Sequence, residues 1–179
     1  MLNEHLSRFL YLRWFTDIQI ILASEKSPPF DVEAFVYEQD TALILGQTHE
    51  IKKPVESTEN LMNQALETQP LTPGHVLVKG KFPVQLLAII HDFDQEPSWR
   101  EEWIEQAFHH IVQISEQHQL QSIGMPLLGT VHGNLSIHRS LTLLRSVIEQ
   151  ISPTYLKRLW LITPIPPEKN SSQTQITYH

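Results

Sequence analysis

The chain of 179 residues contains no cysteine, and it has no long uninterrupted apolar run. The missing cysteines exclude disulfides, thiolate metal sites and cysteine nucleophiles, and they fit a reducing compartment. No run approaches the ~18–20 apolar residues of a membrane span. Charged residues interrupt the N-terminal stretch, where a signal peptide needs an apolar core. We therefore expect a cytoplasmic protein that does not enter a membrane.

Clusters of positive charge are also absent. The formal net charge is −7, from 13 basic and 20 acidic residues, and no run of Lys or Arg occurs. Binding to a nucleic-acid backbone needs a basic face, so we do not expect nucleic acid as a partner. Hydrophobic residues make up 41% of the chain, which is enough for a core. We predict one domain over residues 1–164 and a flexible tail over residues 165–179, whose composition is polar and proline-rich.

Strand and helix patterns alternate in the second half of the chain. We expect strands within residues 6–23 and at 31–37, 75–80, 84–91, 122–128 and 157–163, and helices at 57–67, 98–118 and 137–151. Ser98 and Ser136 are the expected caps of the last two helices. The alternation predicts an α/β domain with a mainly parallel sheet and helices on both faces.

One loop carries a pattern suited to anion binding. Residues 122–135 read SIGMPLLGTVHGNL, in which Gly129 and Gly133 bracket Thr130, Val131 and His132. Glycine lets a ligand approach the backbone, and the following helix presents free N–H groups, so phosphate is the expected occupant. The Thr130 hydroxyl and a ring nitrogen of His132 are expected to add hydrogen bonds to it. The alternative is a tight connection with no ligand. The loop is neither a Walker motif nor a dinucleotide fingerprint.

Other candidate chemistry is weaker. His91, Asp94 and His132 could converge on a metal, but no ligand-spacing motif is present, and we expect no metal and no cofactor. A carboxylate near a strand end could serve as a general base, although loop solvation and capping are the preferred roles. The candidates are Asp31, Asp40, Asp92 and Asp94.

The glycine loop resembles the second phosphate-binding loop of macro domains. The stretch DVEAFVYEQD is similar to the family strand that ends in Asn-Ala-Ala-Asn, and TPGHVLVKGKFPVQLLAIIHDFD to the stretch in which Thr-x-Gly leads to a strand ending in Ile-His. The resemblance covers roughly residues 17–163. It implies a three-layer α/β/α fold with a mixed, mostly parallel sheet, and ADP-ribose or a derivative as ligand. Some members hydrolyse ADP-ribosyl linkages, and others only bind.

The chain also departs from the family pattern. At the second Asn of Asn-Ala-Ala-Asn it has Asp40, which the resemblance makes a ribose contact and a candidate catalytic residue. Glu25 falls where the family has its adenine-reading acid. Val131 replaces the second glycine of Leu-Gly-Thr-Gly, and a glycine-rich first phosphate loop is not visible.

Three hypotheses follow. The first is a divergent macro-domain-like protein that binds ADP-ribose or another phosphate-containing nucleotide without efficient catalysis. The second is a hydrolase of ADP-ribosyl linkages or phosphorylated ribose that uses Asp40. The third is a module for a protein partner, with no small-molecule site.

Overall fold

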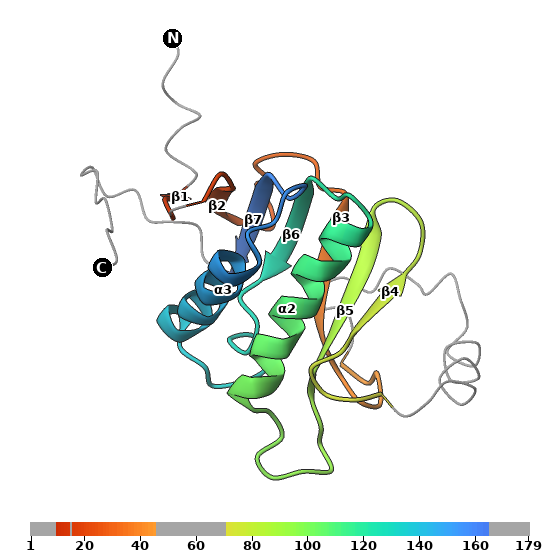
Figure 1. The fold of residues 1–179 in the computed structure, drawn as a ribbon. Helices are drawn as coiled ribbons and strands as arrows, with labels where there is room; N and C mark the ends of the chain where they lie inside the picture. Colours follow the sequence, from red (N-terminus) through yellow and green to blue (C-terminus); the bar gives the residue numbers. More distant parts are fainter. Residues whose placement is uncertain (1–9, 15, 46–70, 165–179) are drawn as a thin grey trace.

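A seven-stranded mixed sheet forms the centre of the computed structural model, which describes residues 10–14, 16–45 and 71–164 (Figure 1). The strands are β1 (Leu10–Leu12), β2 (Gln19–Ser24), β3 (Ala34–Asp40), β4 (Val76–Lys79), β5 (Val84–His91), β6 (Ser122–Pro126) and β7 (Arg158–Thr163). Their order in the sheet is β1-β2-β7-β6-β3-β5-β4. The five inner strands pair in parallel, and β1 and β4 are antiparallel edge strands. The predicted α/β fold with a mostly parallel mixed sheet is confirmed.

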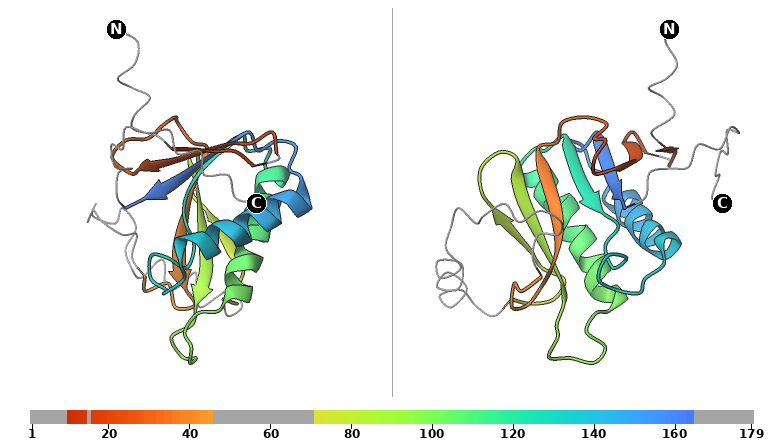
Figure 2. Two further views of the ribbon diagram at one scale, coloured as in Figure 1. Left: turned by 90° about the vertical axis from the view of Figure 1, so that its left-hand side faces the viewer. Right: turned by 180° about the vertical axis from the view of Figure 1, so that it is seen from behind.

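Two helices cover one face of this sheet. They are α2 (Glu101–Gln117) and α3 (Ile137–Ile151), which lie side by side and on the same side of the strands in every view (Figures 1 and 2). The sequence predicted helices on both faces, and the described residues contain a helical layer on one. The helix expected at residues 57–67 and the tail expected at residues 165–179 lie outside the described residues.

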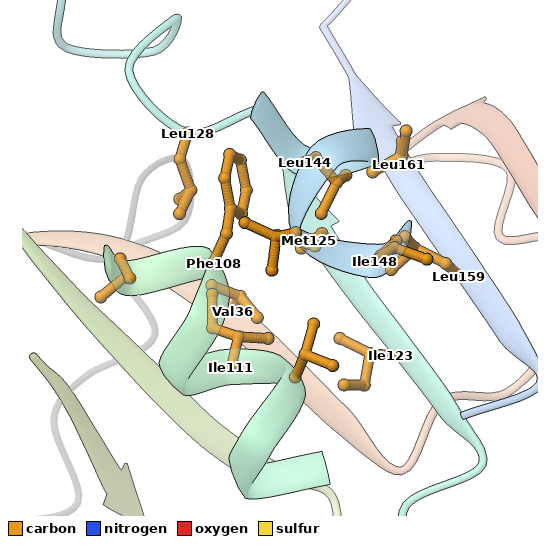
Figure 3. Packing of buried hydrophobic residues seen from close by; sticks show 14 of the residues in the cluster. Val36, Phe108, Ile111, Ile123, Met125, Leu128, Leu144, Ile148, Leu159 and Leu161 are labelled. Atoms are coloured by element: carbon orange, nitrogen blue, oxygen red, sulfur yellow. The ribbon is translucent and has the colours of Figure 1, made fainter. Parts of the chain in front are cut away.

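The main core fills the space between the two helices and the sheet (Figure 3). Both helices are amphipathic, because their apolar residues recur at three- and four-residue spacing and so form one stripe. Phe108 of α2 and Leu144 of α3 are almost completely buried, and they face Val36 and Met125 of the sheet. This packing fixes the helices, and with them the loops at the strand ends.

A smaller apolar cluster lies on the opposite face of the sheet. The rings of Phe35 on β3 and Trp160 on β7 meet edge to face, with centroids 6.0 Å apart. The indole N–H of Trp160 donates to the carbonyl of Ala23 at 3.0 Å, which satisfies its one polar group. Alternate residues of β2 and β7 therefore serve two different cores, as a strand with two buried faces requires.

The predicted helix boundaries are right for α3 and wrong in part for α2. Ser136 caps α3, and its hydroxyl accepts the N–H of Arg139 at 3.1 Å. Ser98 does not cap α2: the N-cap is Arg100, which makes no side-chain capping bond. The strand expected at residues 31–37 is shifted along the chain, since β3 ends only at Asp40. Among the described residues, no helix is long and apolar enough to cross a membrane.

Candidate functional site

The candidate site lies at the carboxyl ends of β3 and β6. These strands are neighbours in the sheet, but the chain leaves them in opposite directions: from β3 it continues towards β4 and β5, and from β6 towards β7. Connections that diverge in this way mark the place where ligands of parallel α/β sheets bind, and we call the space between these two strand ends the crevice. The glycine loop of residues 127–135 follows β6 and borders this crevice.

A buried carboxylate joins the two sides of the crevice. Glu38, near the end of β3, is 5% exposed, and its Oε1 accepts the N–H of Gly129 at 2.8 Å. The Nε2 atom of His91, at the end of β5, lies 3.6 Å from the same oxygen, and His91 is 1% exposed. Glu38 Oε2 and His91 Nε2 have no hydrogen-bond partner within the part of the chain that the structure describes. The N–H of Gly129 is thus bound to a buried side-chain oxygen of the protein itself.

The next part of the glycine loop lies at the protein surface. In the described structure, the N–H groups of Val131, His132, Gly133 and Asn134 donate to no protein group. Three of these residues are exposed, and Gly133 is half-buried. Consecutive N–H groups that lack a protein acceptor and lie beside a helix start are a general feature of anion-binding loops.

Internal hydrogen bonds give this loop its shape. The Thr130 hydroxyl donates to the carbonyl of Leu127 at 2.7 Å, and the N–H of Leu135 donates to the carbonyl of Gly129 at 3.2 Å. From the sequence, we expected the Thr130 hydroxyl and the free N–H groups of α3 to hold the anion. In the structure that hydroxyl is used within the loop, and the Ser136 cap takes one helix N–H.

Both glycines of the loop are required by geometry. Gly129 has φ of +83°, a conformation that L side chains rarely adopt. A Cβ at Gly133 would lie 2.5 Å from the carbonyl oxygen of Gly129, which is too close for any side chain. Val131 replaces the family's second glycine, and its β-branched side chain, which disfavours positive φ, suggested a different backbone path for the loop; Val131 is not among the described residues with positive φ. The β-branched residue is therefore accommodated, and its side chain is 48% exposed.

Asp40 shapes a different loop. Its carboxylate accepts the N–H groups of Ala42, Ile44 and Leu45 at 2.7 to 2.8 Å, and its exposed fraction is 0%. Gln39, beside it, donates its side-chain amide to the carbonyl of Leu45. Asp40 therefore lies at the predicted edge of the sheet, but both of its oxygens are used to fold the turn that follows β3. A catalytic role for Asp40 stays a prediction.

The histidines of the crevice contact aromatic rings. His91 stacks on Phe93 and meets His132 edge to face, with both ring centroids 6.1 Å away. Of the carboxylates that follow β5, Asp92 accepts the N–H of Asp94, and its hydrogen bonds order the turn after the strand. The described residues contain no group of three or more His, Cys, Asp or Glu side chains able to hold a metal ion.

Glu25 lies apart from the glycine loop. It is exposed and follows β2, which β7 and β6 separate from β3 in the sheet order. Its charge nevertheless acts on Tyr37: burial, and to a lesser extent the Glu25 carboxylate, raise the pKa of the Tyr37 hydroxyl. Both effects disfavour the phenolate, so Tyr37 stays a neutral hydroxyl. Contact of Glu25 with adenine stays a prediction.

Glu38 was not singled out as a site residue from the sequence. It lies within the stretch DVEAFVYEQD, in which the family resemblance points instead to Asp40, the residue aligned with the family Asn. Strand alternation contained the missing information: Ala34, Val36 and Glu38 are two apart, so a carboxylate continues the buried apolar face of β3. A buried Glu needs a donor, and the loop of the neighbouring strand provides it.

No family model matches this sequence, and no curated protein matches it. Solved structures do match. The Oceanobacillus iheyensis macrodomain with ADP is 14% identical, with a TM-score of 0.63, over 86% of this chain and 87% of that one. A mutant of the same macrodomain with ADPR has a TM-score of 0.66 at 14% identity, over 88% and 90% of the two chains.

A third similar structure is the macrodomain of Thermus aquaticus DarG. It is 19% identical, with a TM-score of 0.63, and the match covers 81% of this chain and 98% of that one. Agreement over most of both chains at such low identity shows a shared fold. The resemblance that the sequence suggested is thus confirmed for the architecture, and this protein has the macrodomain fold in a divergent form.

Proposed function

We propose that this protein binds ADP-ribose or a related phosphate-containing nucleotide in the crevice between β3 and β6, without efficient catalysis. One observation carries the proposal: the run of N–H groups from Val131 to Asn134 has no protein acceptor in the described structure. Phosphate oxygens are the acceptors that such a run suits, and the adjacent start of α3 adds a favourable dipole. Similar structures hold ADP and ADPR.

The charges around the crevice argue for weak binding. Glu38 is buried beneath the loop and Asp40 beneath the neighbouring turn, and a negative charge near a phosphate opposes its binding. The guanidinium closest in sequence to the loop, that of Arg139, forms an ion pair with Glu101. Backbone N–H groups and the ring of His132 are thus the main attraction for phosphate.

The hydrolase alternative finds less support than binding. It assigns the reaction to Asp40, whose two oxygens accept three backbone N–H groups. A general base needs an oxygen within reach of the water or hydroxyl that it deprotonates. Asp40 would have to release the turn that follows β3 before it could take this role.

Thermal shift and calorimetry with ADP-ribose test the binding proposal. We expect ADP-ribose to raise the melting temperature of the wild type, and Val131→Asp to abolish the shift because it adds a negative charge at an exposed loop position. Gly129→Glu should abolish it too, although the buried site makes this variant a risk for folding. Gly80→Glu is the matched control, since Gly80 also has positive φ but has open space around it.

A protein-interaction role is the second candidate, and one observation favours it. Three large apolar side chains are exposed on loops that follow β3, β5 and β6: Ile44 at 74%, Phe93 at 55% and Val131 at 48%. Apolar residues gathered at one edge of a sheet can anchor a partner. If ADP-ribose, other nucleotides and sugar phosphates all leave the melting temperature unchanged, the binding proposal is wrong and this candidate replaces it.

A further inference from the structure

A second concave site lies away from the crevice, between edge strand β4 and helix α2. It is a surface pocket of about 170 Å³ lined by His75, Val76, His110, Gln113, Ile114 and Gln117. His75 directly precedes β4, and the other polar residues lie on one face of α2, at three- and four-residue spacing. Every polar side chain in this lining carries an atom able to donate a lone pair to a metal ion.

The backbone fixes the orientation of the His110 ring. Its Nδ1 lies 2.7 Å from the carbonyl oxygen of Gly74, and since a carbonyl only accepts, Nδ1 carries the hydrogen. In the neutral ring, Nε2 then keeps its lone pair. Metal-binding histidines typically have this arrangement, in which the nitrogen that does not bind the metal donates to a carbonyl or carboxylate.

The two rings have the separation of a chelating pair. The centroids of His75 and His110 are 5.0 Å apart, with an angle of 49° between the ring planes. A metal ion about 2.1 Å from one nitrogen of each ring places the ring centres roughly 5 Å apart at a tetrahedral ligand angle. The side chain of His75 is exposed and hydrogen-bonds to no described residue, so its ring is free to turn towards the ion.

We propose that His75 and His110 together bind one divalent transition-metal ion of the Cu²⁺, Ni²⁺ or Zn²⁺ class. Imidazole nitrogen is a preferred ligand of these ions, and water and the side-chain oxygens of Gln113 or Gln117 complete the coordination. With two protein nitrogens, the site is weaker than a structural zinc site with four protein ligands. This inference is independent of the nucleotide proposal, because it concerns other residues on another part of the sheet.

Titration of the full chain without an affinity tag tests the proposal. We expect one Cu²⁺ per chain, with an electron paramagnetic resonance spectrum showing two imidazole nitrogens, and tighter binding of Cu²⁺ than of Ni²⁺ or Mn²⁺. His75→Ala and His110→Gln should each weaken Cu²⁺ binding at least tenfold and leave one nitrogen in the spectrum. The amide introduced by His110→Gln retains a donor for the Gly74 carbonyl, and His75 is exposed, so both variants should fold.

His118→Ala is the matched control, because His118 is an exposed histidine at the end of the same helix and does not line the pocket. Its Cu²⁺ affinity should equal that of the wild type. A wild-type spectrum without two equivalent imidazole nitrogens would overturn the proposal. So would an equal loss of affinity in all three variants, since Cu²⁺ would then be spread over surface histidines.

Discussion

Glu38 and Asp40 lie two residues apart at the end of β3, and their carboxylates hold two different loops. Glu38 accepts the N–H of Gly129 from the loop after β6, whereas Asp40 accepts three N–H groups from the turn that directly follows it. Both side chains are buried. Two carboxylates of one strand thus hold the loops on both sides of the crevice, and each can be tested by a substitution that keeps its volume.

The Glu38 carboxylate is expected to be the anchor of the glycine loop. Glu38→Ala leaves the buried N–H of Gly129 without an acceptor, which should lower the free energy of unfolding by ~1–3 kcal/mol. Glu38→Gln keeps an acceptor oxygen and should cost less. Chemical denaturation measures both, and hydrogen exchange at the Gly129 amide should become faster in the Ala variant. Equal stability of the Ala variant and the wild type would show that the bond contributes nothing.

Asp40 should be more sensitive to loss of its charge than Glu38. In Asp40→Asn, the side-chain amide has one acceptor oxygen for three backbone N–H donors, and its NH₂ group faces N–H groups to which it cannot hydrogen-bond. We therefore expect the free energy of unfolding to fall by ~1–3 kcal/mol. Asp94→Asn, an exposed residue of the next loop, is the control and should be near neutral. A fully stable Asp40→Asn protein would argue that the carboxylate is kept for chemistry and not for folding.

Gly133 and Gly80 form a matched pair of glycine substitutions. Gly133→Ala forces a Cβ against the Gly129 carbonyl and should deform the loop, with loss of any ADP-ribose binding. Gly80→Ala meets no atom within 4 Å and carries only the strain of its positive φ, about 1 kcal/mol. It should therefore bind as the wild type does. Calorimetric titration of the two variants separates damage to the loop from a general loss of stability.

The ion pair between Glu101 and Arg139 should give a small pH dependence of stability. Hydrogen bonding to Arg139 lowers the pKa of Glu101, and the reciprocal bond raises that of Arg139. A carboxylate with a lowered pKa in the folded state stabilises the fold above its unfolded pKa of about 4.3, and this stabilisation is lost as the pH falls through the folded value. Both side chains are about half exposed, so solvent screens the effect.

Glu101→Gln therefore should lower the melting temperature slightly at pH 7 and leave it nearly unchanged at pH 3. Glu102→Gln, the adjacent exposed residue in the first turn of α2, is the control for charge at the helix start. If both variants change the melting temperature equally at every pH, the helix dipole and not the pair with Arg139 is responsible.

Periodicity predicted the second half of the fold well. The stripe of α3 and its Ser136 cap both depend on residues close in sequence, and α3 begins and ends where its apolar period does. The α2 boundary was less accurate, because Ser98 is used in pairing: its carbonyl accepts the N–H of Asp92 at 2.7 Å. A residue with a high capping propensity can thus lie outside the helix because its backbone pairs with a neighbouring strand end. The local sequence pattern does not reveal such pairing.

The candidate site was predictable in place but not in detail. Its glycine loop stood out because Gly129 and Gly133 are local features of the sequence. Glu38, which accepts the N–H of Gly129, could not be predicted in the same way. It is 91 residues away in the sequence, and only the pairing of β3 with β6 brings the two residues together. Asp40 likewise lies at the strand end that the family resemblance indicated. Its hydrogen bonds to the turn that follows β3 depend on the path of the backbone there, which composition does not specify.

The order of strands in the sheet has a consequence for how the crevice forms during folding. Its walls come from residues far apart in the chain, and the segment that joins β5 to β6, which contains α2, passes over β3 in the sheet order. Contacts of such long sequence separation are slow to form, so the crevice should be among the last parts of the protein to assemble. A molecule that binds there would recognise the completed sheet alone, and by mass action it would stabilise the folded chain as a whole against partly folded forms.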